Sequence, residues 1–290
     1  MKKIGLVLLI GFLASLTIAA IDTATTFIPP FTVTTLRLMI ASAIFCGILS
    51  FLKPKYHWHA RGIADMVIVG LLNIGLPFLC LAVALKYISG SLSAALFNTT
   101  PIFTMAIAHY LLSDEKLNPV KIVGAAIAII GATILVLSNA SGLATSSQQG
   151  WIGQMLIIFA SFTSALGVVY TRVRFPKENI FVVTAGQVLA SLAVVAPLAF
   201  IVEGVPTLTS YAWQGWVAVF VATLCGPVVV FWLVFYMINK YSASLAGFAS
   251  IATPFFSIII GILFLGEVLT IPFIIGTLFL VIGVWSLHNF

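Results

Sequence analysis

The sequence predicts an all-α polytopic membrane protein with ten transmembrane helices, arranged as two inverted five-helix repeats. Three observations predict it: an apolar composition, a regular series of apolar runs, and a residue pattern that occurs in both halves. Of the 290 residues, 62% are hydrophobic and only 7% are charged, whereas a soluble domain carries about 25% charged residues. This composition excludes a water-soluble fold.

Ten apolar runs follow one another along the chain with short connections between them. A membrane-spanning helix needs roughly 20 predominantly apolar residues, because only there are all backbone polar groups satisfied without water. The predicted spans are residues 4–21, 30–52, 63–85, 91–112, 119–138, 151–171, 179–202, 212–238, 243–265 and 270–288. They leave no room for a sizeable domain outside the membrane.

Charged, proline and aromatic residues mark the ends of the first five runs. Lys2 and Lys3 precede the first run, and a cleaved signal peptide is the alternative interpretation of this basic start. The run is long enough to span and further spans follow it, which favours a first transmembrane helix. The second run opens after Pro29, and the ends of the next three are marked by Lys53, Trp58, Lys86, Tyr110, Lys116 and Lys121.

The last five runs are bounded in the same way. Gly150-Trp151 opens the sixth run, and Arg172 and Arg174 close it. The remaining ends are marked by Lys177, Glu203, Trp213, Lys240, Tyr241, Glu267 and Trp285. Trp and Tyr prefer the membrane interfaces, so the aromatic residues at these ends support the same spans.

The distribution of basic residues predicts the orientation. Cytoplasmic loops are enriched in Lys and Arg, and with a cytoplasmic N-terminus all 13 basic residues except Lys86 and Arg37 fall on the cytoplasmic side. The formal net charge of +6 therefore needs no nucleic-acid partner. We expect a bacterial inner (cytoplasmic) membrane, with both termini in the cytoplasm.

The two halves, residues 1–138 and 139–290, share a spaced pattern. In the first half it comprises Lys86-Tyr87, Ser91-Leu92, Thr100-Pro101, Glu115, Gly124 and Gly131; in the second, Lys240-Tyr241, Ser244-Leu245, Thr253-Pro254, Glu267, Gly276 and Gly283. The acidic residue precedes the first glycine by nine positions in both halves. Five spans per half is an odd number, so the second half enters the membrane in the opposite sense.

Prolines and glycines interrupt paired spans. Pro101 and Pro254 lie in mid-span, where each removes a helical hydrogen bond and leaves the carbonyls of Phe97 and Ser250 predicted free or water-facing. The third and eighth spans contain Gly75-Leu76-Pro77 and Gly226-Pro227. Such breaks indicate a transporter's binding site, although proline can also simply kink a membrane helix.

The runs from Tyr87 to Gly131 and from Tyr241 to Gly283 resemble the duplicated EamA-type domain of the drug/metabolite transporter superfamily. They share its small-residue helix start, mid-helix proline, acidic loop residue and glycine-rich last helix. A Trp-Gly pair frequent in the family's first helix is absent here. The resemblance implies a ten-helix secondary carrier that often exports amino acids or related metabolites. It also implies that the fifth and tenth helices pack the halves together and do not line the cavity.

Arg37 is predicted to lie within the second span, about 10 Å from its outer end at 1.5 Å per residue. A charge at the bilayer centre costs at least about 2.5–3.5 kcal/mol, so it needs a partner or a wet cavity. One hypothesis is that Arg37 binds a substrate carboxylate. The alternative is that Arg37 snorkels or pairs with Asp22 or Glu203.

Polar and aromatic residues near the breaks are candidates for the remaining site. Polar side chains at mid-membrane depth can orient a ligand or only hold helices together; they are Asn73, Asn98, Thr99, Thr100, Gln187, Ser250 and Thr253. Trp232 and Tyr236 can form an aromatic wall or simply pack. Asp65 is expected to pair with Arg61 at the interface, and Glu115 and Glu267 are expected to be structural.

Missing motifs narrow the function. The sequence has no phosphate-binding loop, no H-E-x-x-H and no G-x-S-x-G. We therefore expect no enzyme activity, cofactor or metal, and a monomer or homodimer whose partners are a small-molecule substrate and the lipid bilayer. The favoured hypothesis is an exporter of small polar metabolites, with amino acids first, that works by alternating access. Other solutes (nucleotide sugars, quaternary amines or drugs), a non-transporting receptor or scaffold, and an intramembrane enzyme remain alternatives.

Overall fold

The computed structural model describes residues 2–52, 60–112, 118–138, 149–175, 178–240, 243–267 and 269–289, and their ordered elements are all helical. The first half contains α1 (Lys2–Phe27), α2 (Pro30–Leu52), α3 (Ala60–Gly70), η1 (Leu71–Gly75), α4 (Leu76–Ala84), α5 (Gly90–Phe97), α6 (Thr100–Leu111) and α7 (Pro119–Leu137). The second contains α8 (Gly150–Arg174), α9 (Ile180–Glu203), η2 (Leu208–Ser210), α10 (Trp213–Thr223), η3 (Leu224–Val230), α11 (Phe231–Lys240), α12 (Ala243–Leu265) and α13 (Ile271–Asn289).

These helices confirm a ten-helix membrane protein. Eight stretches of the described residues are long and apolar enough to cross a membrane, and two shorter apolar helices, Ile251–Leu265 and Ile271–Ser286, complete the set. The first helix continues to Phe27, beyond the predicted end at residue 21. It does so because the hydroxyls of Thr23, Thr25 and Thr26 donate to carbonyls three or four residues back, which satisfies polar groups inside the last turn.

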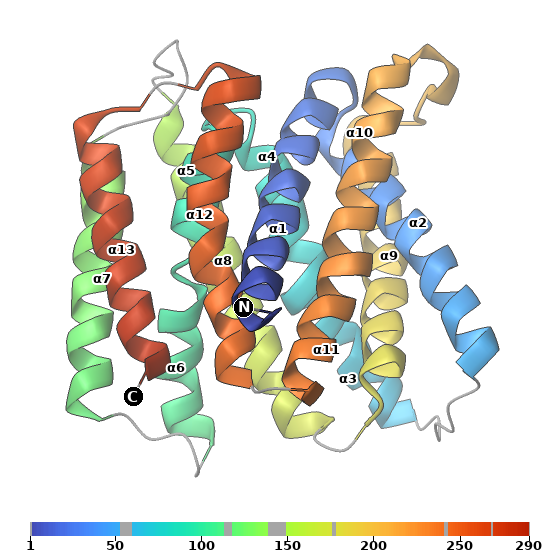
Figure 1. Cartoon of the computed structure of the whole chain (residues 1–290). Coiled ribbons are helices and arrows are strands. Elements are labelled where there is room, and N and C mark those ends of the chain that lie inside the picture. The colour runs from blue at the N-terminus through green and yellow to red at the C-terminus, as the bar shows by residue number, and fades with distance from the viewer. Residues whose placement is uncertain are drawn as a thin grey trace.

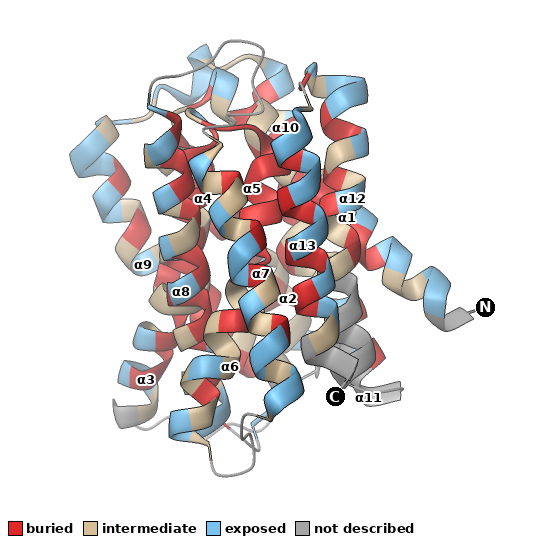
Figure 2. Cartoon of the chain, turned by 90° about the vertical axis from the view of Figure 1, so that its left-hand side faces the viewer, coloured by how far each residue is buried: buried red, intermediate tan, exposed pale blue. Residues whose placement is uncertain are grey.

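The helices form an upright bundle with the connections at its two ends (Figure 1). We call the end where α2, α6 and α11 finish the lower end, and the opposite end, with the α12–α13 connection, the upper end. Buried residues gather inside the bundle, and exposed residues cover the outward helix faces (Figure 2). Many exposed residues are large and apolar, such as Ile201, Leu263 and Phe264, as a surface in contact with lipid requires.

α7 and α13 pack closely on each other at one side of the bundle (Figure 1). The contact depends on glycine, because a Cβ atom at Gly131 would lie 2.5 Å from the backbone nitrogen of Leu280 and 2.6 Å from the carbonyl oxygen of Gly276. This arrangement agrees with the role that the family resemblance implies for the fifth and tenth helices. Neither helix contributes to the pocket described below.

The third and eighth spans are each interrupted by a π-helical turn. η1 lies between α3 and α4 and ends at Gly75, and η3 lies between α10 and α11 and contains Gly226 and Pro227. π-turns inside α-helices occur often at functional sites because the extra residue redirects side chains. The predicted breaks in these two spans are therefore present, and both contribute residues to one pocket.

The two mid-span prolines behave differently from each other. The chain turns at Asn98 and Thr99 before Pro101, which separates α5 from α6, whereas α12 continues through Pro254. The prediction that the Phe97 carbonyl is free was wrong. It accepts hydrogen bonds from the Thr100 hydroxyl at 2.7 Å and the Ser161 hydroxyl at 3.4 Å, so side chains replace the bond that proline removes.

Candidate functional site

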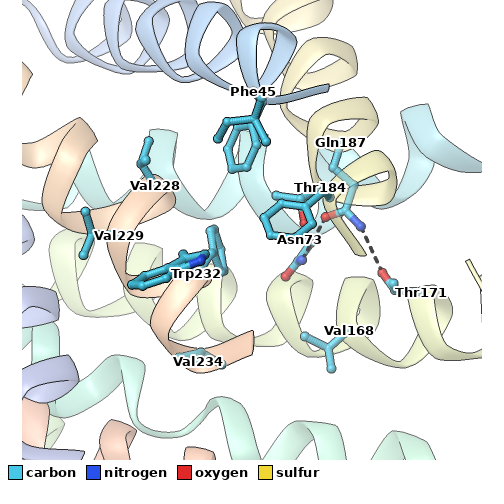
Figure 3. Close-up of a pocket in the computed structure, with 13 residues that line it drawn as sticks. Phe45, Asn73, Val168, Thr171, Thr184, Gln187, Val228, Val229, Trp232 and Val234 are labelled. Atoms are coloured by element: carbon cyan, nitrogen blue, oxygen red, sulfur yellow. Dashed lines mark hydrogen bonds between the residues drawn. The ribbon is translucent and has the colours of Figure 1, made fainter. Parts of the chain in front are cut away.

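A cavity of about 360 Å³ lies between the two π-turns (Figure 3). Its lining residues place it toward the lower end of the bundle. It takes side chains from the C-terminal halves of α2 and α8, from the N-terminal half of α9, from both π-turns and from α11. They are Phe45, Ile48, Asn73, Val168, Thr171, Phe181, Thr184, Gln187, Val228, Val229, Phe231, Trp232 and Val234. No charged side chain occurs among these described lining residues.

One wall of the cavity is a chain of polar side chains. Asn73 Nδ2 donates to Gln187 Oε1 at 3.2 Å, and Gln187 Nε2 donates to Thr171 Oγ1 at 3.4 Å (Figure 3). Behind this wall, Ser164 Oγ donates to Asn73 Oδ1 at 3.4 Å. The chain joins η1, α8 and α9, so the amide groups face the cavity in a defined orientation.

Two glycines allow the polar wall to form. A Cβ atom at Gly70 would lie 2.5 Å from the carbonyl oxygen of Gln187, and one at Gly167 would lie 2.6 Å from Asn73 Cβ. A larger residue at Gly70 would push α9 away from the end of α3, and one at Gly167 would push α8 away from η1. The close approach of three helices here therefore depends on residues that contribute no side chain.

The opposite wall is aromatic and aliphatic. Trp232 lies across the cavity from the Asn73–Gln187 pair, with Phe45 nearby (Figure 3). The indole stacks on the ring of Tyr236, with centroids 6.2 Å apart and planes inclined by 27°. Trp232 is 54% exposed. It lines the cavity, whereas Tyr236 supports it from behind and is not among the lining residues.

Arg37 is buried on the upper side of this cavity, with only 3% of its surface exposed. Its guanidinium carbon lies 4.6 Å from the centre of the Phe78 ring, and Nη2 donates to the Ala222 carbonyl at 3.4 Å. Among the described residues, Nε and Nη1 have no hydrogen-bond partner and Arg37 forms no ion pair with a carboxylate. A buried cation in this state is incompletely compensated.

The predicted alternative partner Glu203 is engaged elsewhere. Its carboxylate accepts hydrogen bonds from the backbone N–H groups of Phe31 and Thr32, at 2.9 and 2.8 Å, and from the Thr32 hydroxyl. Glu203 therefore caps the N-terminus of α2. No hydrogen bond or ion pair joins Asp22, near the end of α1, to Arg37 within the described residues.

A void of about 10 Å³ adjoins Arg37, lined by Thr34, Arg37, Leu38, Ala41, Ile74, Phe78, Val188 and Pro227. Three of these residues, Ile74, Val188 and Pro227, directly adjoin in sequence the cavity residues Asn73, Gln187 and Val228. The void is about the size of one water molecule. The void and the main cavity are therefore both bounded by η1, α9 and η3.

Other candidate residues lie away from the cavity. Asn98 and Thr99 are buried at the α5–α6 turn, where Thr99 Oγ1 donates to the Leu96 carbonyl and Asn98 Nδ2 has no partner among the described residues. The Thr100 hydroxyl donates a hydrogen bond to the Phe97 carbonyl. At the other mid-span proline, the carbonyl of Thr253 accepts a hydrogen bond from the Ser15 hydroxyl at 2.8 Å. The Ser250 side chain and Glu115 lie outside the described part of the chain.

Asp65 joins two helices near the lower end of the bundle. Its Oδ1 accepts from the Tyr170 hydroxyl at 2.8 Å, and its Oδ2 accepts from Arg174 Nε at 2.8 Å and Nη2 at 2.7 Å. These bonds fasten α3 to α8 near the lower end, beside the cavity residue Thr171. The side chain of the expected partner, Arg61, lies outside the described residues.

Four residues that line the cavity were not predicted from the sequence: Phe45, Thr171, Phe181 and Thr184. A signal for two of them was present, because Phe181, Thr184 and Gln187 recur every three residues and therefore share one face of α9. Thr171 lies four residues after Gly167, whose close contact with Asn73 only the fold reveals.

A bundle of ten apolar helices, with a polar-walled cavity where two spans are interrupted, defines an integral multi-pass membrane protein of the transporter class. The comparison with known families agrees. The chain belongs to the EamA-like transporter family, whose family model matches residues 1–137 and 151–288. This confirms the resemblance to the drug/metabolite transporter superfamily, and the protein is a membrane transporter.

Relatives with similar sequences carry the same general description. The chain is 26% identical over 261 residues to the uncharacterized transporter YoaV of Bacillus subtilis (strain 168), covering 89% of this chain and 87% of that protein. It is 26% identical over 271 residues to an uncharacterized transporter of Buchnera aphidicola subsp. Schizaphis graminum (strain Sg), covering 91% and 86%. A solved crystal structure of a protein with 21% identity superposes with a TM-score of 0.66 over 98% of this chain and 95% of its own, which supports the fold.

Proposed function

We propose that this transporter is a secondary carrier that exports small polar metabolites, amino acids or related compounds first among them, by alternating access. The observation that carries the proposal is the position of Arg37. It is a buried cation, two of whose nitrogens have no hydrogen-bond partner among the described residues, on the upper side of a cavity whose described lining is uncharged. A solute carboxylate would supply the missing countercharge and could accept a charge-assisted hydrogen bond from Nε or from Nη1, which lie on different edges of the guanidinium group.

The remainder of the cavity fits the other end of such a solute. Its volume of about 360 Å³ is within the usual range for small-molecule sites. The Asn73–Gln187–Thr171 chain offers amide and hydroxyl groups for a polar head, and Phe45, Phe181 and Trp232 offer an apolar surface. An amino acid with a sizeable side chain satisfies both walls.

Quaternary amines and cationic drugs are a second candidate because Trp232, which stacks on Tyr236, presents its indole ring to one side of the cavity. Arg37 opposes this candidate, since it would repel a cation, and no carboxylate is present among the described lining residues to offset it. The arrangement of charges therefore favours a solute that carries a carboxylate.

The proposed mechanism depends on the two halves, residues 1–138 and 139–290, acting as inverted repeats. The basic residues would place the lower end, toward which the cavity lies, in the cytoplasm of a bacterial inner membrane. The structure would then represent a state that faces inward. Rocking of the two halves about the π-turns η1 and η3 would close this end and carry a solute bound near Arg37 to the other side.

Counterflow in liposomes tests the proposal. Purified protein is reconstituted into liposomes loaded with one amino acid, and uptake of the labelled amino acid is followed for a panel of amino acids, their methyl esters and quaternary amines. We expect counterflow for some amino acids and none for their esters, which lack the carboxylate. Equal counterflow of an amino acid and its ester, or counterflow of quaternary amines alone, would reject the proposal. Liposomes without protein measure the background uptake.

A further inference from the structure

Two carboxyl groups lie beside the N-terminus of α5 at the upper end of the bundle, the end opposite to the one toward which the cavity lies. Glu267 follows α12, with only 8% of its surface exposed, and Asp22 lies in the last turns of α1 and is half-buried. Glu267 Oε1 and Asp22 Oδ2 lie 3.5 and 3.7 Å from the position that a Cβ atom of Gly90 would occupy. The two groups therefore converge on the N-terminus of α5.

Glu267 is held firmly in this position. Its Oε1 accepts from the backbone N–H of Ser91 at 3.3 Å, and its own N–H donates to the Gly261 carbonyl at 3.0 Å. Its Oε2 packs against Gly261 so closely that a Cβ atom there would overlap it. This oxygen is buried and has no hydrogen-bond partner among the described residues.

The surroundings compensate little of this negative charge. α5 contributes backbone N–H groups worth roughly half a positive charge, and the sequences of α5, α10 and α12 contain no titratable side chain. α13 has only His288, at its opposite end. In the turn before α5, Lys86 is exposed and Tyr87 is half-buried. Within the described part of the chain, neither side chain forms a hydrogen bond or an ion pair with Glu267 or Asp22.

We propose that Asp22 and Glu267 bind one proton between them, and that this proton holds α1 and the N-terminus of α5 against the α12–α13 connection. Two neighbouring buried carboxyl groups cannot readily both ionise, so a pair of this kind retains a proton that either group alone would lose. When the proton leaves, the two like charges repel and the upper end loosens. The inference does not depend on which solute the carrier moves.

Burial raises the pKa of Glu267 to about 7, although the N–H groups of Ser91 and Gly90 and the Ser89 hydroxyl act in the opposite direction. A glutamate in an unfolded chain has a pKa near 4.3. Between these values the folded protein therefore binds more protons than the unfolded chain. Stability contributed by this group is present at low pH and is lost as the pH rises toward about 7.

This pH dependence separates a proton site from a simple helix cap. A charged cap would have a lowered pKa, so its contribution to stability would already be complete above about pH 5 and would not change with pH in this range. Thermal or denaturant unfolding of the full chain in detergent, measured at several values between about pH 5 and pH 8, distinguishes the two. For one bound proton the unfolding constant rises by up to about tenfold per pH unit in this window.

The comparison that isolates the site uses Glu267→Gln, Asp22→Asn and the control Glu203→Gln. Glu203 also caps a helix, but both of its oxygens accept hydrogen bonds. We expect E267Q and D22N each to flatten the wild-type slope, and E203Q to lower stability without changing the slope. An unchanged slope in both E267Q and D22N, or wild-type stability that stays constant or increases with pH over this range, would overturn the proposal.

Infrared spectra of the wild-type protein provide a measurement that does not depend on how the variants fold. A protonated carboxylic acid has a C=O stretching band that a carboxylate lacks. We expect this band to persist near neutral pH and to disappear at alkaline pH in the wild type and in E203Q. Its absence from the wild type throughout the mildly acidic range would exclude a shared proton.

Discussion

The Nδ2 atom of Asn73 donates a hydrogen bond to Oε1 of Gln187 over 3.2 Å, joining residues 114 positions apart in the sequence. Asn73 lies in the π-turn η1 and Gln187 in the N-terminal half of α9, so the bond connects two helices from different halves of the chain. The bond also orients Gln187 Nε2 toward Thr171. The polar wall of the cavity depends on this one pair.

Replacement of Gln187 by leucine is expected to weaken solute binding. The side chain keeps a similar volume, but Asn73 and Thr171 each lose a hydrogen-bond partner, at a cost of about 1–3 kcal/mol. We expect the KM of a transported solute to rise roughly tenfold in liposomes. The exposed Gln214, outside the cavity, provides the control Gln214→Leu, and equal effects of both variants would contradict the prediction.

Replacement of Arg37 by methionine is expected to abolish selectivity for the carboxylate. Methionine retains the packing on Phe78 but removes the charge, and bonds between a charged group and its ligand contribute about 1.5–3 kcal/mol. Transport of an amino acid should therefore fall about tenfold to a hundredfold, whereas its methyl ester should be affected little.

Protein stability distinguishes loss of binding from loss of folding in Arg37→Met. Arg37 has no carboxylate partner among the described residues, so removing its charge leaves no opposite charge unpaired. The melting temperature in detergent should therefore stay close to that of the wild type. Lys86→Met, which removes an exposed cation, is the matched control. A normal rate of amino-acid transport by Arg37→Met would show that Arg37 does not bind the solute carboxylate.

Replacement of Gly167 by alanine is expected to destabilise the protein and impair transport together. The added methyl group would lie 2.6 Å from Asn73 Cβ and 2.7 Å from its backbone nitrogen, and overpacking of this kind costs about 1–3 kcal/mol. Gly47 of α2 has nothing within 4 Å of its Cβ position. The control Gly47→Ala should therefore leave the melting temperature unchanged or raise it, and similar melting temperatures for the two variants would contradict this account.

Labelling of single cysteines tests the orientation and the inverted repeat. Lys86 and Lys240 occupy equivalent positions in the pattern of the two halves, so inversion places them on opposite sides of the membrane. After Cys46, Cys80 and Cys225 are replaced, we expect Lys86→Cys to react with an impermeant thiol reagent from outside the cell and Lys240→Cys only after permeabilisation. Reaction of both from the same side would reject inversion and, with it, alternating access by this arrangement.

The sequence predicted the spans more accurately than the site. Each predicted run coincides with a helix or a pair of helices, and Gly75 and Gly226 lie in the two π-turns. Asn73, Gln187 and Trp232 do meet in the cavity, but Asn98 and Thr99 lie at another helix turn. Residue type and depth identified polar groups in the membrane, but they did not show which of these groups face one another.

Composition and spacing by themselves determined that the chain crosses the membrane ten times. Every segment in the hydrocarbon core must satisfy its backbone N–H and C=O groups internally and carry few charges, whatever its neighbours are. The tertiary structure alone decided which side chains are partners: Asp65 with Arg174, Glu203 with the start of α2, and Glu267 with the start of α5. These choices depend on the packing of helices distant in sequence. Glycines such as Gly70 and Gly167 permit that packing, and no local pattern specifies it.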